Sequence, residues 1–131
     1  MLTGSNFTSI AFPKAAEATY ANGINKWNSV VGYYIDLIGI GHAHGFQRFS
    51  NGSFITLNYP GAQQTFATGI NDSGAIVGYY YSSSPARGFI HFKGQWATLN
   101  YPNGLFTILN GISDAGVIIG RSNTNKHAIA F

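Results

Sequence analysis

Four histidines are the first residues of this chain that could support chemistry, because imidazole binds metal ions and titrates near neutral pH. They are His42, His44, His91 and His127. His42 and His44 are two residues apart, so their side chains would share one face of a β-strand. A metal site needs further ligands, and the chain contains no cysteine and only four carboxylates. We therefore interpret the histidines as residues at strand edges and predict no metal site and no cofactor.

The carboxylates limit the catalytic chemistry that this chain could perform. They are Glu17, Asp36, Asp72 and Asp114. A glycoside hydrolase needs a pair of carboxylates, but Asp72 and Asp114 occupy equivalent positions in a repeated turn, which explains both as turn residues. Serines are frequent, yet no G-x-S-x-G elbow is present. We expect a non-enzymatic protein, and a hydrolase using Asp36 or Glu17 is the least favoured alternative.

Adjacent tyrosines are a stronger signal, and they indicate binding. They occur at positions 33–34 and 79–81, and in a strand the members of a neighbouring pair face opposite sides. A flat ring with a hydroxyl suits a sugar, which has apolar faces and hydroxyl edges. The residues predicted to bind a ligand are Tyr34, Tyr80, Trp27, Arg87, His44 and Asn125. The alternative is that the tyrosines pack between repeats, where their size and polar tip are equally useful.

A phrase that occurs three times must position these residues. The copies are residues 23–34, 69–80 and 111–120, and each holds two glycines nine positions apart with turn residues between them. Short β-forming runs on either side of the turn predict a hairpin. In the first copy Asn28 stands where the other copies have a turn glycine, so we expect Asn28 to adopt the glycine conformation. Two glycines per repeat predict a crowded region near a symmetry axis.

Each repeat is expected to contain four short strands, with the glycine hairpin as the second and third. The expected first strands alternate apolar and polar residues and end in proline; they are 7–13, 54–60 and 96–102. The expected fourth strands are 44–49, 87–92 and 127–131. The prediction is one all-β domain, 1–131, of three repeats at about 4–51, 52–93 and 94–131.

Composition excludes two classes of partner. Charged residues are 8% of the chain, well below the roughly 25% of ordinary soluble domains. The net charge of +3 arises from scattered cations, so the basic patch of a nucleic-acid binder is missing. No apolar run approaches the roughly 20 residues that span a bilayer. We therefore expect no nucleic-acid partner and no membrane partner, and residues 1–6 lack the features of a signal peptide.

The repeated phrase, followed by an H-G-F or R-G-F strand, resembles the HAF-type extracellular repeats that occur in tandem in bacterial proteins. The resemblance extends from about Phe7 to Phe131. The strand matches at His44 and Phe46 in the first copy, at Phe89 in the second, and at His127-Ala128 in the third. It implies tandem β-propeller-like repeats and an extracellular location, and it implies no catalytic residue.

Four strands in about 40 to 50 residues is the period of a propeller blade, and three blades are too few to close a propeller. We favour three blades completed by homo-oligomerisation, as a homodimer of six blades or a homotrimer of nine. The alternative is a β-trefoil or β-prism that closes as a monomer. The favoured function is a lectin-like module that binds carbohydrate through repeated aromatic and polar loops. The alternative function is a self-assembling propeller scaffold without a small ligand.

Overall fold

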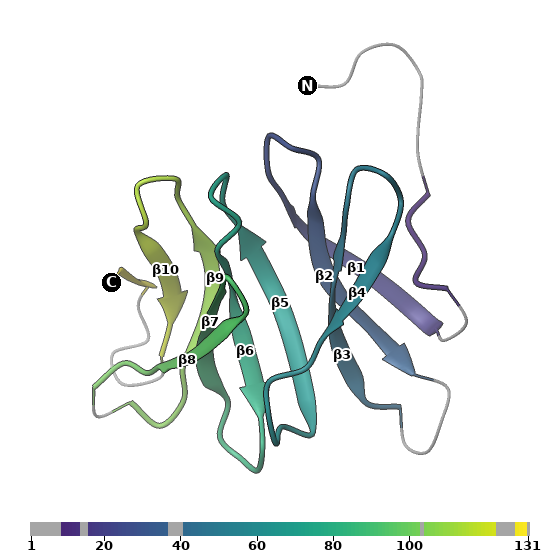
Figure 1. Cartoon of the computed structure of the whole chain (residues 1–131). Helices are drawn as coiled ribbons and strands as arrows, with labels where there is room; N and C mark the ends of the chain where they lie inside the picture. The colour runs from purple at the N-terminus through teal and green to yellow at the C-terminus, as the bar shows by residue number, and fades with distance from the viewer. Residues whose placement is uncertain (1–8, 14–15, 37–40, 103, 123–127, 131) are drawn as a thin grey trace.

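The computed structural model describes residues 9–13, 16–36, 41–102, 104–122 and 128–130. Within these ranges the chain is all-β and forms three antiparallel sheets side by side, in the order of the sequence (Figure 1). The all-β class predicted from the sequence is therefore confirmed. No sheet in the described ranges closes on itself.

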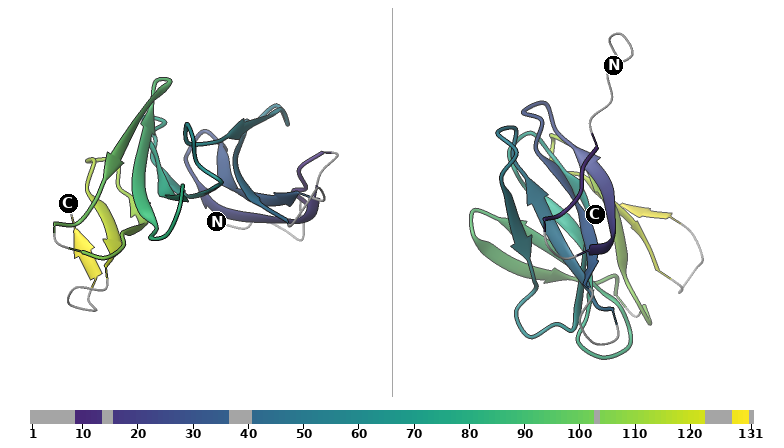
Figure 2. Two further views of the ribbon diagram at one scale, coloured as in Figure 1. Left: turned by 90° about the horizontal axis from the view of Figure 1, so that it is seen from below. Right: turned by 90° about the vertical axis from the view of Figure 1, so that its right-hand side faces the viewer.

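Neighbouring strands in each sheet are also neighbours in sequence. The first sheet consists of β1 (Ala16–Ile24), β2 (Val30–Asp36), β3 (Ala43–Arg48) and β4 (Phe54–Leu57). The second consists of β5 (Gln64–Ile70), β6 (Ile76–Tyr81), β7 (Arg87–Phe92) and β8 (Gln95–Leu99). The third consists of β9 (Ile108–Ile112), β10 (Ile118–Arg121) and β11 (Ala128–Ala130). The left view of Figure 2 shows that the sheets stand in a row, with the second between the first and the third.

The order of strands within a repeat differs from the expectation. The segments expected to open the second and third repeats instead close the preceding sheets, because β4 pairs with β3 and β8 pairs with β7. The hairpin expected to be second and third is the first and second strand of each sheet. As a result the third sheet has three described strands instead of four. The strand expected at 7–13 is wrong over its described part, because residues 9–13 pair with no strand, and residues 7–8 lie outside the described residues.

The three hairpin turns behave as their composition predicts. Gly74 and Gly116 adopt a φ of 88°, a left-handed conformation that glycine reaches without a steric penalty. Asn28 occupies the equivalent position with a φ of 61°, which asparagine tolerates better than most other residues. The prediction that Asn28 replaces the turn glycine is confirmed.

The inner strands β1, β5 and β9 approach one another closely at a line of glycines. A Cβ atom added to Gly23 would lie 3.1 Å from the Cα of Gly69, and one added to Gly69 would lie 3.0 Å from the Cα of Gly111. Both distances are shorter than ordinary contacts between carbon atoms. The repeated first glycine is therefore required by backbone packing between sheets, as the sequence predicted for a crowded region.

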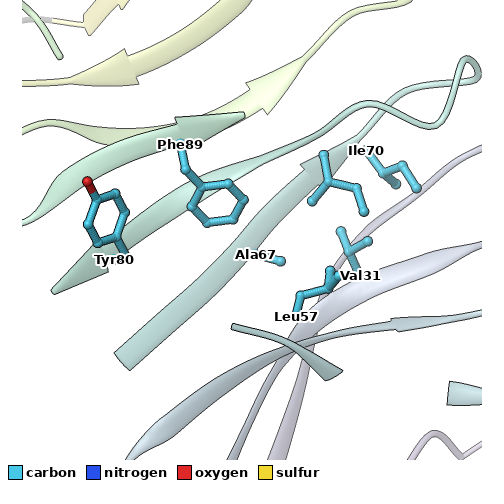
Figure 3. Packing of buried hydrophobic residues seen from close by; sticks show 7 residues of the cluster. Val31, Leu57, Ala67, Ile70, Tyr80 and Phe89 are labelled. Atoms are coloured by element: carbon cyan, nitrogen blue, oxygen red, sulfur yellow. The ribbon is translucent and has the colours of Figure 1, made fainter. Parts of the chain in front are cut away.

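Apolar side chains fill the space between consecutive sheets. Val31 of β2 and Ile70 of β5 belong to the cluster between the first and second sheets. Figure 3 shows this cluster, whose other members include Leu57, Ala67, Tyr80 and Phe89. Val77 of β6 packs with Leu109 and Ile118 of the third sheet. The first and second sheets thus each bury one aliphatic residue of their second strand against the sheet that follows.

Two ladders of hydrogen bonds connect the hairpin turns of the three sheets. In one ladder, the side-chain amide of Asn25 donates to the carbonyl of Asn71 at 3.0 Å, and that of Asn71 donates to the carbonyl of Ser113 at 3.1 Å. In the other, the backbone N–H of Lys26 donates to Asp72 and that of Asp72 donates to Asp114, both at 2.8 Å. The Lys26 N–H, which favours the charged carboxylate, lowers the pKa of Asp72 below its ordinary value.

A threonine in each inner strand, or directly before it in the case of β9, anchors the chain that enters the sheet. Thr19 accepts a hydrogen bond from the N–H of Phe12 at 3.1 Å, and Thr65 accepts one from the N–H of Tyr59 at 2.9 Å. Tyr101 donates to Thr107 in the same way, at 2.9 Å. This explains why a threonine precedes the first glycine by four residues in every repeat.

The Thr65 hydroxyl gives a test of this anchor. We expect Thr65→Val to lower the free energy of unfolding by about 1 to 3 kcal/mol, because valine keeps the shape of this 1% exposed side chain but leaves the Tyr59 N–H without its acceptor. Thr65→Ser keeps the hydroxyl and serves as the control. Urea unfolding of the two variants measures the difference, and equal stability would contradict an anchoring role.

Candidate functional site

A groove of about 380 Å³ lies where the inner strands β1, β5 and β9 of the three sheets come together. Its lining comes from the first two strands of each sheet: Asn22, Tyr33, Thr68, Tyr79, Ile108, Asn110 and Arg121. Most of the exposed surface in the groove is polar, which sets it apart from the apolar space between the sheets. We consider this groove the candidate functional site, because it is formed by equivalent positions of all three repeats.

A β-bulge in every inner strand supplies one side chain to the groove. The register between β1 and β2 shifts between Ala21 and Gly23, so Asn22 is the extra residue. The same shift leaves Thr68 unpaired in β5 and Asn110 unpaired in β9. A bulge redirects the side chain of its extra residue and is frequent near binding sites. The three bulges therefore explain why polar residues of inner strands point to a common groove.

Two of the bulge residues also connect the sheets. The side-chain amide of Asn22 donates to the carbonyl of Ala67 at 3.0 Å. The hydroxyl of Thr68 lies 2.6 Å from the carbonyl of Leu109 and 3.2 Å from the carbonyl of Val77. The contacts of Asn22 with Ala67 and of Thr68 with Leu109 run from one sheet to the next. These two residues therefore line the groove and also hold neighbouring sheets together.

Aromatic rings form a continuous row beside the groove. Tyr20 stacks on Tyr33 with ring centroids 4.7 Å apart, and Tyr33 meets the edge of Phe66 in the next sheet at 4.8 Å. Phe66 stacks on Tyr79 at 4.6 Å, and Tyr79 meets the edge of Tyr81 at 6.1 Å. The two groove tyrosines are thus fixed by their neighbours and present their hydroxyls without large side-chain freedom.

The groove contains one cation among neutral groups. Burial, with a contribution from neighbouring tyrosines, raises the pKa of Tyr79 above its ordinary value, and the charge of Arg121 partly opposes this shift. Burial also raises the pKa of Tyr33. Both hydroxyls are therefore neutral at physiological pH. Together with two amides and a threonine hydroxyl, they make a set of hydrogen-bonding groups that lacks a carboxylate, so the described lining is suited to binding and has no general acid and base pair.

The sequence prediction selected the other tyrosine of each pair. Tyr34 and Tyr80 are buried inside the sheets: Tyr34 stacks on Phe12 at 3.9 Å and Tyr80 stacks on Tyr59 at 3.8 Å. Their hydroxyls lie within hydrogen-bonding distance of Thr56 and Thr98, respectively. The alternative interpretation is that the tyrosines pack between repeats. Tyr80 does belong to the apolar cluster between the first and second sheets, whereas Tyr34 packs with Val30 and Phe46 of its own sheet.

His44 belongs to a small polar cluster at the far end of the first sheet. Its Nε2 lies 2.7 Å from Oδ2 of Asp36 and its Nδ1 lies 2.9 Å from Oδ1 of Asn58. Its ring lies beside Tyr34 at 5.3 Å. The described residues contain no group of three or more histidines and carboxylates that could hold a metal ion. His44 is therefore held by hydrogen bonds with Asp36 and Asn58 and does not line the groove.

The remaining predicted residues are spread over the molecule. Trp27 is exposed in the first hairpin turn, where its indole N–H donates to the carbonyl of Asp72 at 3.1 Å. Arg87 is exposed at the start of β7 and lines a separate hollow of about 110 Å³. Asn125 lies outside the described residues. The structure thus brings Tyr34 and His44 together, but it does not gather the described members of the predicted set into one site.

Sequence reasoning missed the residues that line the groove, although the repeat contains the signal. Asn22, Thr68 and Asn110 each precede the first glycine of a repeat, and Tyr33, Tyr79 and Arg121 each follow the second. Aligning the three repeats at their glycines therefore gives two equivalent positions, and both hold polar or aromatic residues in every repeat. The glycine that follows each residue of the first set is a signal for the bulge, because a glycine inside a strand often marks one.

Comparisons with known proteins do not identify this chain, since no protein-family model matches it and no curated protein matches it. None of the described residues forms a helix long and apolar enough to cross a membrane. The groove geometry is therefore the basis for the functional argument.

The raised tyrosine pKa values predict how stability depends on pH. A tyrosine whose folded pKa exceeds its unfolded value of 10.0 binds its proton more tightly in the folded state. We therefore expect the free energy of unfolding to be unaffected by Tyr33 and Tyr79 below about pH 9 and to fall as the pH rises above 10. Tyr79→Phe should reduce this fall. A spectrophotometric titration in which all eight tyrosines of the folded protein ionise as one class at pH 10.0 would contradict it.

Proposed function

We propose that this protein is a non-enzymatic, propeller-type binding module that takes carbohydrate in its central groove. The observation that carries the proposal is the groove itself, to which equivalent positions of the three sheets contribute Asn22 and Tyr33, Thr68 and Tyr79, and Asn110 and Arg121. Fixed aromatic rings offer surfaces to the apolar faces of a sugar. Amides and hydroxyls offer both donors and acceptors to its hydroxyl groups.

The fold part of this proposal is that the three sheets are blades of a propeller that several copies of the chain complete. Three features favour it over a trefoil or prism monomer. The sheets are consecutive in sequence, their first strands lie innermost along a line of glycines, and each packs face to face on the next. These are the features of neighbouring blades, and three blades need further blades to surround an axis.

A neutral ligand is favoured over an anionic one. Arg121 is the one cation in the groove lining, and the other polar groups there are uncharged. An anionic ligand would leave most of its charge without a partner, whereas a neutral sugar needs none. Arg121 can donate hydrogen bonds to sugar hydroxyls through its planar guanidinium group.

A second candidate function is a self-assembling scaffold without a small ligand. Exposed isoleucines at the two ends of the row of sheets favour it, since Ile24 and Ile119 are 62% and 52% exposed. Exposed apolar surface of this kind usually marks a contact with another protein. A protein that assembles but is not retained on any carbohydrate would support the scaffold and contradict the binding module.

The test of the binding module is retention on a panel of immobilised polysaccharides, with the Tyr33→Phe/Tyr79→Phe double variant as the probe. This change keeps both rings stacked and removes only the groove hydroxyls. We expect affinity to fall roughly tenfold to thirtyfold, because each hydroxyl contributes about 1 kcal/mol in hydrogen bonds. Tyr81→Phe, outside the groove, is the control and should bind as the wild type does.

Two results would count against the proposal. If no polysaccharide of a broad panel retains the wild-type protein, carbohydrate is not the ligand. Equal retention of the wild type and the double variant would place binding elsewhere on the molecule.

A further inference from the structure

The outer faces of the first and third sheets, at the two ends of the row, expose apolar residues. The equivalent faces inside the chain are covered by a neighbouring sheet. Val31 and Val77 are completely buried against the next sheet, but their counterpart Ile119 in the third sheet is 52% exposed. In the other direction, Ile70 is 7% exposed against the preceding sheet, whereas its counterpart Ile24 in the first sheet is 62% exposed. The residue types are conserved across the repeats, and only the covering sheet differs.

A hollow marks each of the open faces. The one on the first sheet has a volume of about 320 Å³ and includes Gly23, Ile24 and Val30 in its lining. The one on the third sheet has a volume of about 350 Å³ and includes Gly111 and Ile119. Inside the chain, the corresponding space holds the apolar clusters between the sheets.

We infer that copies of this chain associate head to tail, with the third sheet of one copy packed on the first sheet of the next in the manner of the two internal interfaces. Ile119 then contacts Ile24 and Val30 of the neighbouring copy, as Val31 and Val77 contact the sheets that follow them. Gly111 meets Gly23 of the neighbour and continues the line of glycines. This inference rests on the proposed propeller, and it specifies the partner as a second copy and the surface as these two faces.

We call the contact between the third sheet of one copy and the first sheet of the next the seam. One hydrogen bond of the internal interfaces can also form there. The bulge residue Asn22 donates to the carbonyl of Ala67, and the bulge residue Thr68 donates to the carbonyl of Leu109. The bulge residue of the third sheet, Asn110, is exposed and has the same side chain as Asn22. At the seam it can donate to the carbonyl of Ala21 in the neighbouring copy.

The chain entering the first sheet is already arranged as if another sheet preceded it. Ile10 and Phe12 pack on the core of the first sheet, as Leu57 and Tyr59 pack on the core of the second. In the second case these residues continue from β4, the fourth strand of the preceding sheet. Ile10 and Phe12 thus occupy, in the first sheet, the places that the end of the preceding sheet and the residues after it hold in the second.

The seam differs from the internal interfaces at the hairpin turns. Asn25 and Asn71 each donate across an interface, but the third repeat has Ser113, which is too short to do so. In the second ladder, Asp72 and Asp114 accept from the preceding turn, whereas the first repeat has Lys26. The seam therefore lacks two hydrogen bonds and is weaker than the internal interfaces, which allows exchange of subunits.

Association also completes the binding groove. At the first internal interface Tyr33 contacts Phe66 of the next sheet, and the equivalent pair at the seam is Arg121 and Tyr20 of the neighbouring copy. An arginine beside a tyrosine ring makes a favourable cation–π contact. Each seam thus places the groove cation against an aromatic ring of the adjacent copy.

The first test is the molar mass in solution, measured by light scattering over a range of concentrations. Wild-type protein should have two or three times the 14.1 kDa mass of the chain. Ile119→Asp and Ile24→Asp should each weaken association at least a hundredfold, because a buried isoleucine is replaced by an unpaired charge. Ile55→Asp changes an exposed strand isoleucine away from the seam and should leave the mass unchanged.

Mixing the two seam variants tests the head-to-tail arrangement. Each variant keeps one intact face, so a mixture should regain one seam per pair and form a dimer. If the third sheets packed on each other symmetrically, Ile24→Asp would not affect the mass and mixing would restore nothing. That result, or a wild-type monomer at every concentration, would overturn the inference.

A gain in affinity protects the test against variants that fail to fold. Ser113→Asn supplies the missing amide of the first ladder and should strengthen association roughly twofold to tenfold per seam. Ser73→Asn, in the equivalent turn of the second sheet, is the control and should change nothing.

These outcomes are separable from those of the proposed function. If the protein binds no carbohydrate but its mass and the effect of Ile119→Asp are as expected, the carbohydrate ligand is contradicted and the head-to-tail association is supported. A monomer that binds carbohydrate through Tyr33 and Tyr79 would keep the groove and remove the seam.

Discussion

The close approach of three backbones is the constraint on which the rest of this structure depends. At Gly23 and Gly69 the inner strands come so near the next sheet that an added Cβ would lie only 3.1 Å and 3.0 Å from the Cα atoms of Gly69 and Gly111, respectively. This contact fixes the separation of the sheets, and the aliphatic residues beside it then reach the facing sheet without leaving voids. The bulge immediately before each of these glycines places a polar side chain at the same level. Packing and groove therefore have a common origin in one short sequence phrase.

The sequence was sufficient to predict the all-β class, the hairpins and the role of Asn28, because each depends on local backbone preferences. It was insufficient for the order of strands. The segment Phe54–Leu57 has the alternation of a half-buried strand whether it pairs with β3 or with β5, and only the hydrogen bonds decide between them. A repeat can be divided at any point of its period, so periodicity alone gives the length of a unit and leaves its boundary open.

The candidate site was harder to predict for a related reason. Tyr33 and Tyr34 are chemically identical, and which of them lies in the core depends on the face that the strand turns to its partner sheet. The buried position has a partner for its hydroxyl in Thr56, and the groove position has the ring of Tyr20. Both environments suit tyrosine, so residue type could not separate them. Register with the paired strands did separate them, and that is a property of the folded chain.

The bulge residues have two tasks, and this divides the groove into a conservative part and a variable part. Asn22 and Thr68 hold adjacent sheets together through their side chains, so a substitution chosen for a different ligand would also disturb the spacing of the sheets. The positions after the second glycine carry no such hydrogen bond to the next sheet among those described, and they already differ within this chain, from Tyr33 and Tyr79 to Arg121. Divergence after gene duplication can therefore change the charge and shape of the groove at these positions while the scaffold is inherited intact.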